Sequence, residues 1–298
     1  MQLLSRPQKE LSPKWFYDAR GSALFDEITR LPEYYLTRTE RSLLEREATA
    51  WLARSRVRAI VELGPGNGEK ARILLAALPS DATYVPVDIS RTYLDAIASD
   101  LQECFPEATI LPVEADITSS LALPRDVPAP AVVAFLGSTL GNFDPLSAQR
   151  LLRRIAAVMR PDDWLLLGAD LKKDAQTLER AYNDAAGVTA EFNSNILRVL
   201  NRELDADFDP DGFQHRAVYD ADAGRVEMHL VARRDMTVTI PDAGRVAVAA
   251  GESIRTEIST KYDRPGLELL LDAAQLTLEH WLTDDEQRFA LLVARRAQ

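Results

Sequence analysis

Residues 60–70 read IVELGPGNGEK, and this stretch decides how the rest of the chain is interpreted. An apolar run rich in β-branched residues enters three glycines at alternate positions, and residues 70–78 then have a composition that suits a helix. The pattern predicts a β-strand, a tight turn and the start of an α-helix. Because glycine has no Cβ, it can adopt a positive φ and lets a ligand approach the main chain closely. We therefore expect a ligand to bind at this turn.

Two classes of nucleotide ligand could use such a turn. A dinucleotide-binding fold favours G-x-G-x-x-G, with the N-terminus of its helix facing a pyrophosphate. Here the pattern is G-x-G-x-G, and Glu69 stands at the helix entrance, where it would repel a diphosphate. S-adenosylmethionine (SAM) has no phosphate and suits this turn better. Residues 83–88 read TYVPVD, a second strand that ends 20 residues after Gly68 in Asp88, which could accept hydrogen bonds from both ribose hydroxyls of SAM.

A glycine-rich turn alone is a weak signal, since an ordinary βα turn followed by a solvated Asp88 would look the same. Strand, turn, helix, strand and acid in this order favour a SAM-dependent methyltransferase with a Rossmann-like α/β core. A third strand is predicted at residues 109–114. Asp116, just beyond it, could meet the adenine amino group of SAM, or it could only cap a turn.

The apolar run at residues 131–136 predicts a central strand that is buried on both faces. Ligands of open parallel sheets bind beyond the carboxyl ends of the strands. We therefore expect the loop at residues 137–145, and Asn142 within it, to face the reacting methyl group. The alternative is that Asn142 only shapes the turn, because Gly-Asn is a common turn pair.

The composition excludes several classes of partner. The net charge is −11, and such an acidic surface would repel nucleic acids and anionic membranes. Cys104 is the single cysteine, so an intrachain disulfide is impossible and a reducing compartment is expected. We see no signal-type apolar run at the N-terminus and no run near the about 20 residues of a membrane helix. The single cysteine and the lack of such runs predict a cytoplasmic protein. The three histidines lie far apart without partner cysteines, so we expect no metal site.

The sequence pattern changes after residue 172. Predicted helices at residues 177–186 and 189–201 are followed by runs of period two, which predict antiparallel strands joined by Asp-Ala-Gly turns. The first pattern resumes at about residue 265. We therefore expect a SAM-binding methyltransferase domain at residues 37–172 and 261–298, and an α+β substrate-recognition domain at residues 1–36 and 173–260. Tyr34 and Tyr35 would either pack on a core or line a pocket in that second domain.

Taken together, these segments resemble the L-histidine Nα-methyltransferases of ergothioneine biosynthesis. The resemblance covers nearly the whole chain and rests on KWFYD at 14–18, LPEYY at 31–35, FLGSTLGN at 135–142, Tyr182 before GVT at 187–189, NREL at 201–204 and TEIS at 256–259. It implies that a monomeric enzyme transfers three methyl groups from SAM to the α-amine of histidine. The mono- and dimethyl forms would be intermediate substrates, and the products would be hercynine and S-adenosylhomocysteine (SAH).

The resemblance also implies how the amino-acid end of histidine is held. Its carboxylate would be bound by Tyr34 and Tyr182, and its α-amine by Asn142 with help from Tyr17. A neutral amide suits this chemistry, because the attacking nitrogen needs a lone pair and a carboxylate beside it would stabilise the ammonium form. We expect neither a covalent intermediate nor a metal.

The imidazole, by the same resemblance, would be bound by Glu257 and Ser259, with Met228 on the wall beside the ring. Side chains at positions i and i+2 of a strand share one face, so Glu257 and Ser259 can contact one small ring. An enzyme that methylates tryptophan or tyrosine derivatives would have no need of this glutamate. A non-catalytic SAM-binding protein is the other alternative.

The cofactor positions of the family match Gly64, Lys70, Asp88 and Asp116, and Gly66 belongs to the same turn. Relatives often have Gly-Ser-Gly-Thr-Ser where this chain has GPGNG. Cofactor binding should survive this difference, since main-chain contacts matter most in such a turn.

Overall fold

The computed structural model describes residues 3–241 and 244–297, and the chain divides into two compact units. Unit 1 is formed by residues 1–35 and 173–261, and unit 2 by residues 36–172 and 262–298. The predicted domain ends at residues 1 and 298 lie outside the described residues. Within the described ranges, no helix has both the length and the apolar character needed to cross a membrane.

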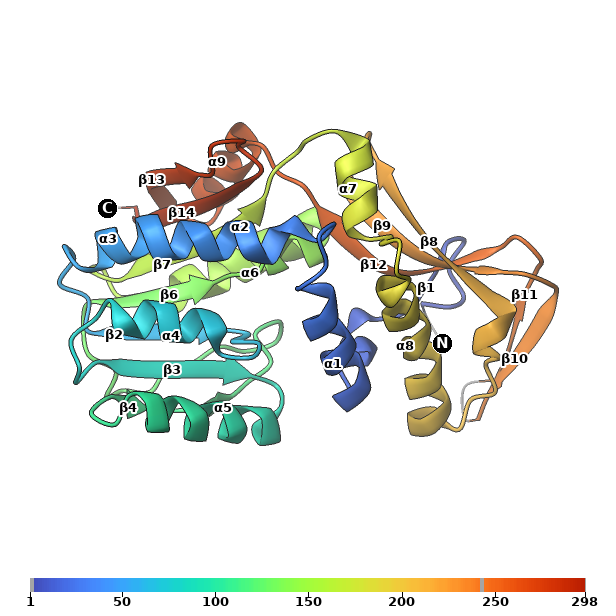
Figure 1. Ribbon diagram of the computed structural model, residues 1–298, viewed down its shortest axis with the longest axis horizontal. Coiled ribbons are helices and arrows are strands. Elements are labelled where there is room, and N and C mark those ends of the chain that lie inside the picture. Colours follow the sequence, from blue (N-terminus) through green and yellow to red (C-terminus); the bar gives the residue numbers. More distant parts are fainter. Residues whose placement is uncertain (1–2, 242–243, 298) are drawn as a thin grey trace. The chain divides into compact units, whose positions relative to one another are not determined.

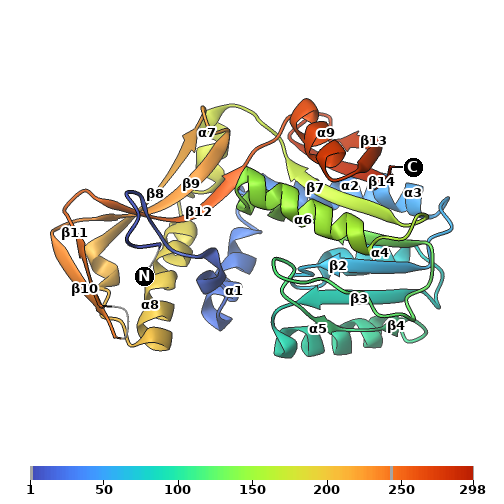
Figure 2. The same ribbon diagram turned by 180° about the vertical axis from the view of Figure 1, so that it is seen from behind.

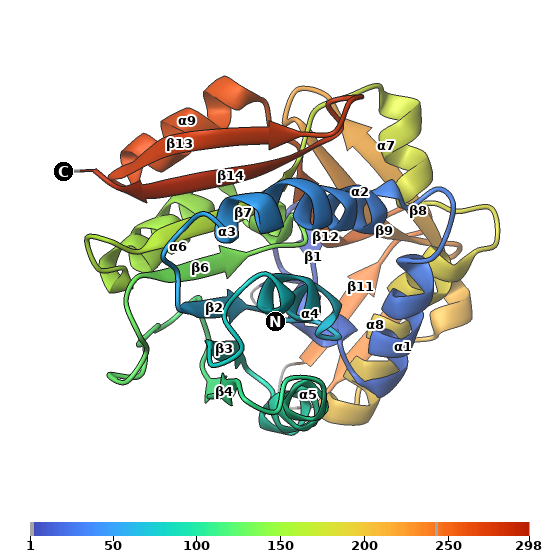
Figure 3. The same ribbon diagram turned by 60° about the vertical axis from the view of Figure 1, so that its left-hand side comes forward.

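Unit 2 is built around an eight-stranded sheet (Figure 1). Its strands are β2 (Ala59–Leu63), β3 (Thr83–Asp88), β4 (Thr109–Ile110), β5 (Val113–Glu114), β6 (Ala131–Phe135), β7 (Trp164–Asp170), β13 (Leu276–Thr283) and β14 (Phe289–Arg296). The order is β13-β14-β7-β6-β2-β3-β4, and β5 pairs with β3. Strands β2 to β7 run parallel, whereas β14 is antiparallel to both β7 and β13 at the edge of the sheet (Figure 3).

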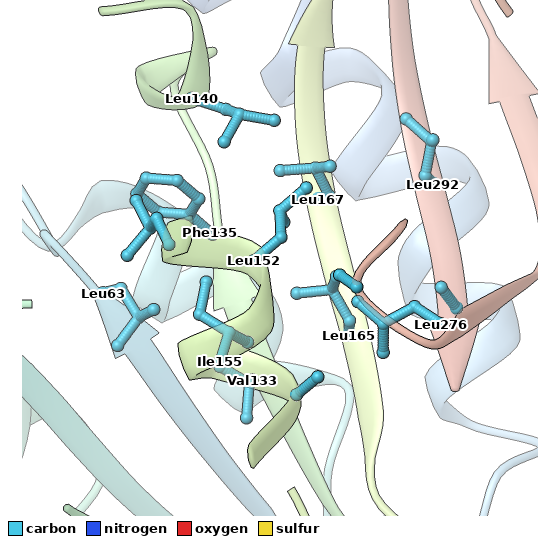
Figure 4. Close-up of a cluster of buried hydrophobic side chains, with 14 of the residues drawn as sticks. Leu63, Val133, Phe135, Leu140, Leu152, Ile155, Leu165, Leu167, Leu276 and Leu292 are labelled. Atoms are coloured by element: carbon cyan, nitrogen blue, oxygen red, sulfur yellow. The ribbon is translucent and has the colours of Figure 1, made fainter. Parts of the chain in front are cut away.

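Helices cover both faces of this sheet, which explains the continuous apolar runs of its strands. In β6, Val133 and Phe135 pack into a core with Leu152 and Ile155 of α6 (Pro145–Val158), as Figure 4 shows. Residues of α9 (Arg264–Ala273) belong to the same core, and both helices lie on this face of the sheet (Figure 2). Val132 and Ala134 point to the other core. The helical segments on that side are α2 (Tyr35–Leu43), a π-helical turn (Leu44–Ala48), α3 (Thr49–Leu52), α4 (Glu69–Ala76) and α5 (Arg91–Cys104). The prediction of a central strand buried on both faces is confirmed.

The third predicted strand, at residues 109–114, is interrupted in the structure. It forms two short pieces, β4 and β5, on either side of Pro112. Proline has no N–H to donate to the neighbouring strand, so the ladder breaks there. The amides of Leu111 and Ala115 still donate to Tyr84 and Asp88 of β3, at 2.8 and 2.9 Å.

In its described residues, unit 1 combines a four-stranded sheet, a separate hairpin and three α-helices. The sheet has the order β1-β12-β9-β8, formed by β1 (Lys9–Glu10), β8 (Phe213–Asp220), β9 (Arg225–Ala232) and β12 (Ser253–Thr260), and the hairpin by β10 (Met236–Ile240) and β11 (Gly244–Val248). The helices are α1 (Ala19–Ile28), α7 (Ala175–Ala181) and α8 (Val188–Leu204). Helix α8 packs against α1, β8 and β9. An Asp-Ala-Gly turn joins β8 to β9 as predicted, whereas the second such turn includes residues 242 and 243, outside the described ranges.

Candidate active site

The glycine turn leaves its main chain uncovered. Gly64 and Gly66 have φ of 72° and 55°, and no heavy atom of the described residues lies within 4 Å of the position that a Cβ would take in either. The amide of Gly64 donates to the carbonyl of Val87 at 2.9 Å, which ties the turn to β3. Gly68, with φ of 74°, precedes α4. A ligand such as SAM can therefore reach bare backbone here, so the turn fits the cofactor that the family implies.

The two acids predicted for the cofactor differ in their surroundings. Asp88, at the end of β3, is half-buried, and burial raises its pKa even though the amides of Ser90 and Ile89 donate to it. Asp116 is exposed, and its Oδ1 accepts hydrogen bonds from the amide and hydroxyl of Thr118, which lower its pKa. Asp116 therefore makes the turn-capping contacts that the sequence left as an alternative, and its adenine role remains a prediction.

Lys70 is held by a glutamate that the sequence reasoning missed. Its Nζ donates to Oε2 of Glu40 at 2.8 Å, and Oε1 of Glu40 accepts from the amide of Gly137 at 2.7 Å. Glu40 is 1% exposed and lies so close to β7 that a Cβ at Gly168 would collide with its carboxylate. A signal was present in the sequence, because Glu40 falls on the apolar face of α2, four residues after Leu36.

Asn142 lies in a 3₁₀ turn (Thr139–Asn142) that follows β6, and it is half-buried. The loop is fixed from two sides. Ser138 Oγ accepts from the amide of Asp170 at 2.9 Å, and the hydroxyl of Tyr262 donates to the carbonyl of Leu140 at 3.3 Å. Because β2, β3 and β6 are parallel neighbours, the structure brings Asn142 to the same edge of the sheet as the glycine turn and Asp88.

The three tyrosines predicted for the amino-acid end of histidine belong to one aromatic cluster of unit 1. The rings of Tyr34 and Tyr182 lie edge to face, with centroids 6.1 Å apart, and Phe25 packs edge-on against both Tyr34 and Tyr17. Burial and the neighbouring Glu257 and Tyr182 all raise the pKa of Tyr17.

A β-bulge in β12 sets the direction of the side chains that are predicted to bind the imidazole. The pairing with β9 shifts between Arg255 and Glu257, so Glu257 stands opposite Met228. Ile254 before the bulge and Thr256 within it are buried, whereas Ser259 is buried beyond it, so the buried positions change from even to odd numbers. Bulges commonly redirect side chains near functional sites.

The carboxylate of Glu257 is the acceptor that the family resemblance assigns to the imidazole. It is half-buried, and within residues 3–241 and 244–297 it accepts no hydrogen bond. Burial raises its pKa to about 7, an effect that the charge of Lys261 partly opposes. Met228, its cross-strand neighbour, is 2% exposed. A perturbed carboxylate of this kind is suited to receive an N–H group from a ligand.

Ser259 and Tyr182 are joined by a buried lysine that the sequence reasoning also missed. The Tyr182 hydroxyl donates to Ser259 Oγ at 2.8 Å, and Lys261 Nζ donates to both oxygens at 2.9 Å. Nζ also lies 4.7 Å from the centroid of the Tyr182 ring. Lys261 continues the odd alternation of Glu257 and Ser259, and this was the available signal.

A chain of hydrogen bonds holds the main chain of Tyr182. His215 Nε2 lies 2.9 Å from the carbonyl of Tyr182, and His215 Nδ1 lies 2.9 Å from the side-chain amide nitrogen of Asn193. Asn193 Oδ1 in turn accepts from the hydroxyl of Thr256, next to the bulge, at 2.7 Å. The amide nitrogen can only donate, so Nδ1 accepts and Nε2–H donates to the carbonyl. Burial lowers the pKa of His215, which favours this neutral form.

Comparison with known proteins identifies the family. The sequence model described as "Histidine-specific methyltransferase, SAM-dependent" matches residues 1–296. The histidine N-alpha-methyltransferase of Mycolicibacterium smegmatis is 43% identical over 98% of this chain and 92% of that protein. Ergothioneine biosynthesis protein 1 of Neurospora crassa is 30% identical over 97% of this chain and 33% of that protein.

Solved structures support the fold. A SAM-dependent methyltransferase from Clostridium acetobutylicum matches 92% of this chain and 98% of its own, with a TM-score of 0.52 and 11% sequence identity. The Rossmann-like α/β methyltransferase fold predicted from the sequence is thereby confirmed, and so is the predicted family. This chain belongs to the histidine-specific, SAM-dependent methyltransferase family.

Proposed function

We propose that this enzyme transfers three methyl groups in succession from SAM to the α-amine of L-histidine, giving hercynine for ergothioneine biosynthesis. The relatives named above support the reaction. The observation that carries the substrate assignment is Glu257, a half-buried carboxylate to which the described part of the chain donates no hydrogen bond. An imidazole N–H would supply the missing donor, and the second ring nitrogen would be met by Ser259.

The amino-acid end of the substrate is assigned to uncharged groups. Tyr34 and Tyr182 would hold the carboxylate, and Asn142 and Tyr17 the amine. When bound, SAM supplies a methyl group activated by a positively charged sulfur. The protein must present the amine with a free lone pair, and a neutral amide and a phenol orient the nitrogen without stabilising its ammonium form. Alignment of the reactants can lower the barrier by about 7–11 kcal/mol.

The cofactor is assigned to the carboxyl edge of the sheet in unit 2. Gly64 and Gly66 would present bare main chain, Asp88 would accept from the ribose hydroxyls, and Asp116 would lie at the adenine end. Lys70 completes the set, with its ammonium already anchored by Glu40. These roles are supported by the uncovered backbone of the turn and by the shared edge of β2 and β3.

Mass spectrometry of one reaction tests the proposal. The enzyme is incubated with SAM and all twenty amino acids, and products are followed with time. We expect histidine alone to gain one, two and finally three methyl groups, with three equivalents of SAH released. Methylation of tryptophan or tyrosine in place of histidine would reassign the substrate. SAM binding without any SAH release would indicate a non-catalytic protein.

A further inference from the structure

Lys261 is a buried cation with no role in the function proposed above. It follows β12 directly and is 1% exposed, and its ammonium donates to the hydroxyls of Tyr182 and Ser259. Burying an ammonium group costs several kcal/mol unless hydrogen bonds compensate, and an apolar side chain of similar length would avoid that cost. A lysine at this position therefore calls for a role beyond packing.

The directions of the hydrogen bonds suggest what that role is. A lysine ammonium can only donate, so each hydroxyl oxygen uses one lone pair to accept from it. Ser259 Oγ also accepts from the Tyr182 hydroxyl at 2.8 Å. Both lone pairs of Ser259 are then occupied, and its own proton is left to donate elsewhere. Ser259 is thereby fixed as a donor toward a ligand. The same arrangement uses the single proton of the Tyr182 hydroxyl at Ser259, so Tyr34 would donate to the substrate carboxylate and Tyr182 would act by holding Ser259.

A donor at Ser259 and an acceptor at Glu257 define one form of the imidazole. The ring nitrogen at Ser259 must carry a lone pair, and the ring nitrogen at Glu257 must carry the proton. Imidazolium has an N–H at both nitrogens and would find no acceptor at Ser259. A neutral ring in a single tautomer satisfies both groups.

We propose that Lys261 is a positioning residue for substrate recognition, which sets the hydroxyls of Ser259 and Tyr182 so that the enzyme selects histidine with a neutral imidazole. This inference rests on the proposed function and specifies the form of the substrate. Lys261 acts through Ser259 and Tyr182. Its contribution should therefore depend on the presence of those hydroxyls.

A double-mutant cycle tests this dependence. Lys261→Met, Ser259→Ala and the double variant are compared by kcat/KM for histidine and by calorimetric affinity for SAH. Losing hydrogen bonds to a charged donor should lower kcat/KM about 10- to 100-fold for Lys261→Met, with SAH affinity within about twofold of wild type. In the Ser259→Ala background the same change should cost less than about fivefold, because coupled residues are non-additive. If Lys261→Met lowers kcat/KM by the same factor in the wild-type and Ser259→Ala backgrounds, or if SAH affinity falls in parallel, Lys261 is only structural.

The pH dependence of binding gives a second readout. Histidine affinity is measured in the presence of SAH from pH 5.5 to 8, across the imidazole pKa of about 6.5. We expect the affinity of the wild type to fall on acidification more steeply than that of Lys261→Met, in which Ser259 regains a lone pair for a second N–H. Glu257 titrates in the same range and Lys261 lowers its pKa, so the comparison is repeated in the Ser259→Ala background, where the part of the difference that comes from Ser259 should vanish. Identical slopes would overturn the inference. Lys261→Gln keeps N–H groups that can donate to the two hydroxyls, so the pH dependence of its histidine affinity should lie between those of the wild type and Lys261→Met. This variant replaces Lys261→Met if Lys261→Met does not fold.

Lys9→Met is the matched control, since it removes a lysine of the same sheet that pairs with Glu252. It should leave kcat/KM and its pH dependence unchanged. If neither the wild type nor this control methylates histidine, the proposed function itself fails. Normal histidine turnover that Lys261→Met leaves unchanged would overturn only the inference about Lys261.

Discussion

Replacing Glu257 by glutamine should make this methyltransferase more stable and less active at the same time. The carboxylate of Glu257 is half-buried, it accepts no hydrogen bond from residues 3–241 or 244–297, and burial raises its pKa to about 7. Glutamine has nearly the same shape and removes only the charge. The free protein should gain from this change, because it no longer has to hold a poorly solvated carboxylate.

The sign and size of the stability gain follow from linkage. A carboxyl whose pKa rises on folding from 4.5 to about 7 destabilises the folded protein as pH increases through that interval, and the penalty is complete above pH 7. At 1.36 kcal/mol for each pH unit the upper limit is about 3 kcal/mol. Because Glu257 keeps some contact with solvent, we expect Glu257→Gln to gain about 1–2 kcal/mol at pH 8 and almost nothing at pH 4.5.

Activity should change in the opposite direction. In the proposed complex the carboxylate accepts a hydrogen bond from the imidazole, and a charge-assisted bond of this kind contributes about 1.5–3 kcal/mol. Its loss corresponds to a decrease of about 10- to 150-fold in kcat/KM for histidine. SAH affinity should not change, since the cofactor is assigned to residues of unit 2.

Chemical denaturation at pH 4.5 and 8, together with steady-state kinetics, measures both effects. Glu227→Gln on β9 is the matched control, because Arg225 and Arg255 lower the pKa of Glu227 despite its burial. That variant should lose stability at pH 8, and the loss should shrink as pH falls below 4.5. If Glu257→Gln also lowers stability at pH 8, Glu257 is a structural residue and our reasoning is refuted.

Three further variants test the remaining assignments. Asp88→Asn should raise the Kd for SAH at least about tenfold, since the ribose hydroxyls lose a charged acceptor, and an unchanged Kd in calorimetry would exclude that role. Asn142→Asp should lower kcat at pH 7 more than Asn142→Ala, because a carboxylate would hold the amine as ammonium, whereas equal losses would argue against contact with the amine. Gly64→Ala meets no neighbouring atom but forces φ near 72° on alanine, so it should cost about 1–2 kcal/mol of stability and additionally weaken SAM binding; unweakened binding would show that the ligand does not approach this backbone.

Much of the fold could be predicted because its determinants are local. The strand, turn and helix around Gly64 follow from glycine spacing and periodicity, and β6 follows from an apolar run that serves two cores. The break at Pro112 could have been anticipated from its missing N–H. The bulge in β12 could not, since it depends on the register with β9, a strand about 30 residues earlier in the chain.

The candidate site could be predicted only in part, because several of its contacts join residues that are distant in the sequence. Glu257 and Ser259 came from the family resemblance, and strand alternation agreed because both lie on the same side of the bulge. Glu40 and Lys261 were missed because their roles depend on partners distant in sequence: Gly137 for Glu40, and Tyr182 for Lys261. Periodicity indicates which face a residue occupies and does not indicate what stands opposite it.

The bulge between Arg255 and Glu257 divides β12 into two parts in which substitutions have different effects. Up to Thr256 the inward side chains pack in the interior around Asn193, so a substitution there changes the stability of the fold. From Glu257 onward, in the function that we propose, the side chains contact the substrate, so a substitution there would change substrate binding. A change of preferred amino acid could thus evolve through two or three substitutions beyond the bulge, whereas deleting a single residue at the bulge would turn the recognition side chains away from their ligand.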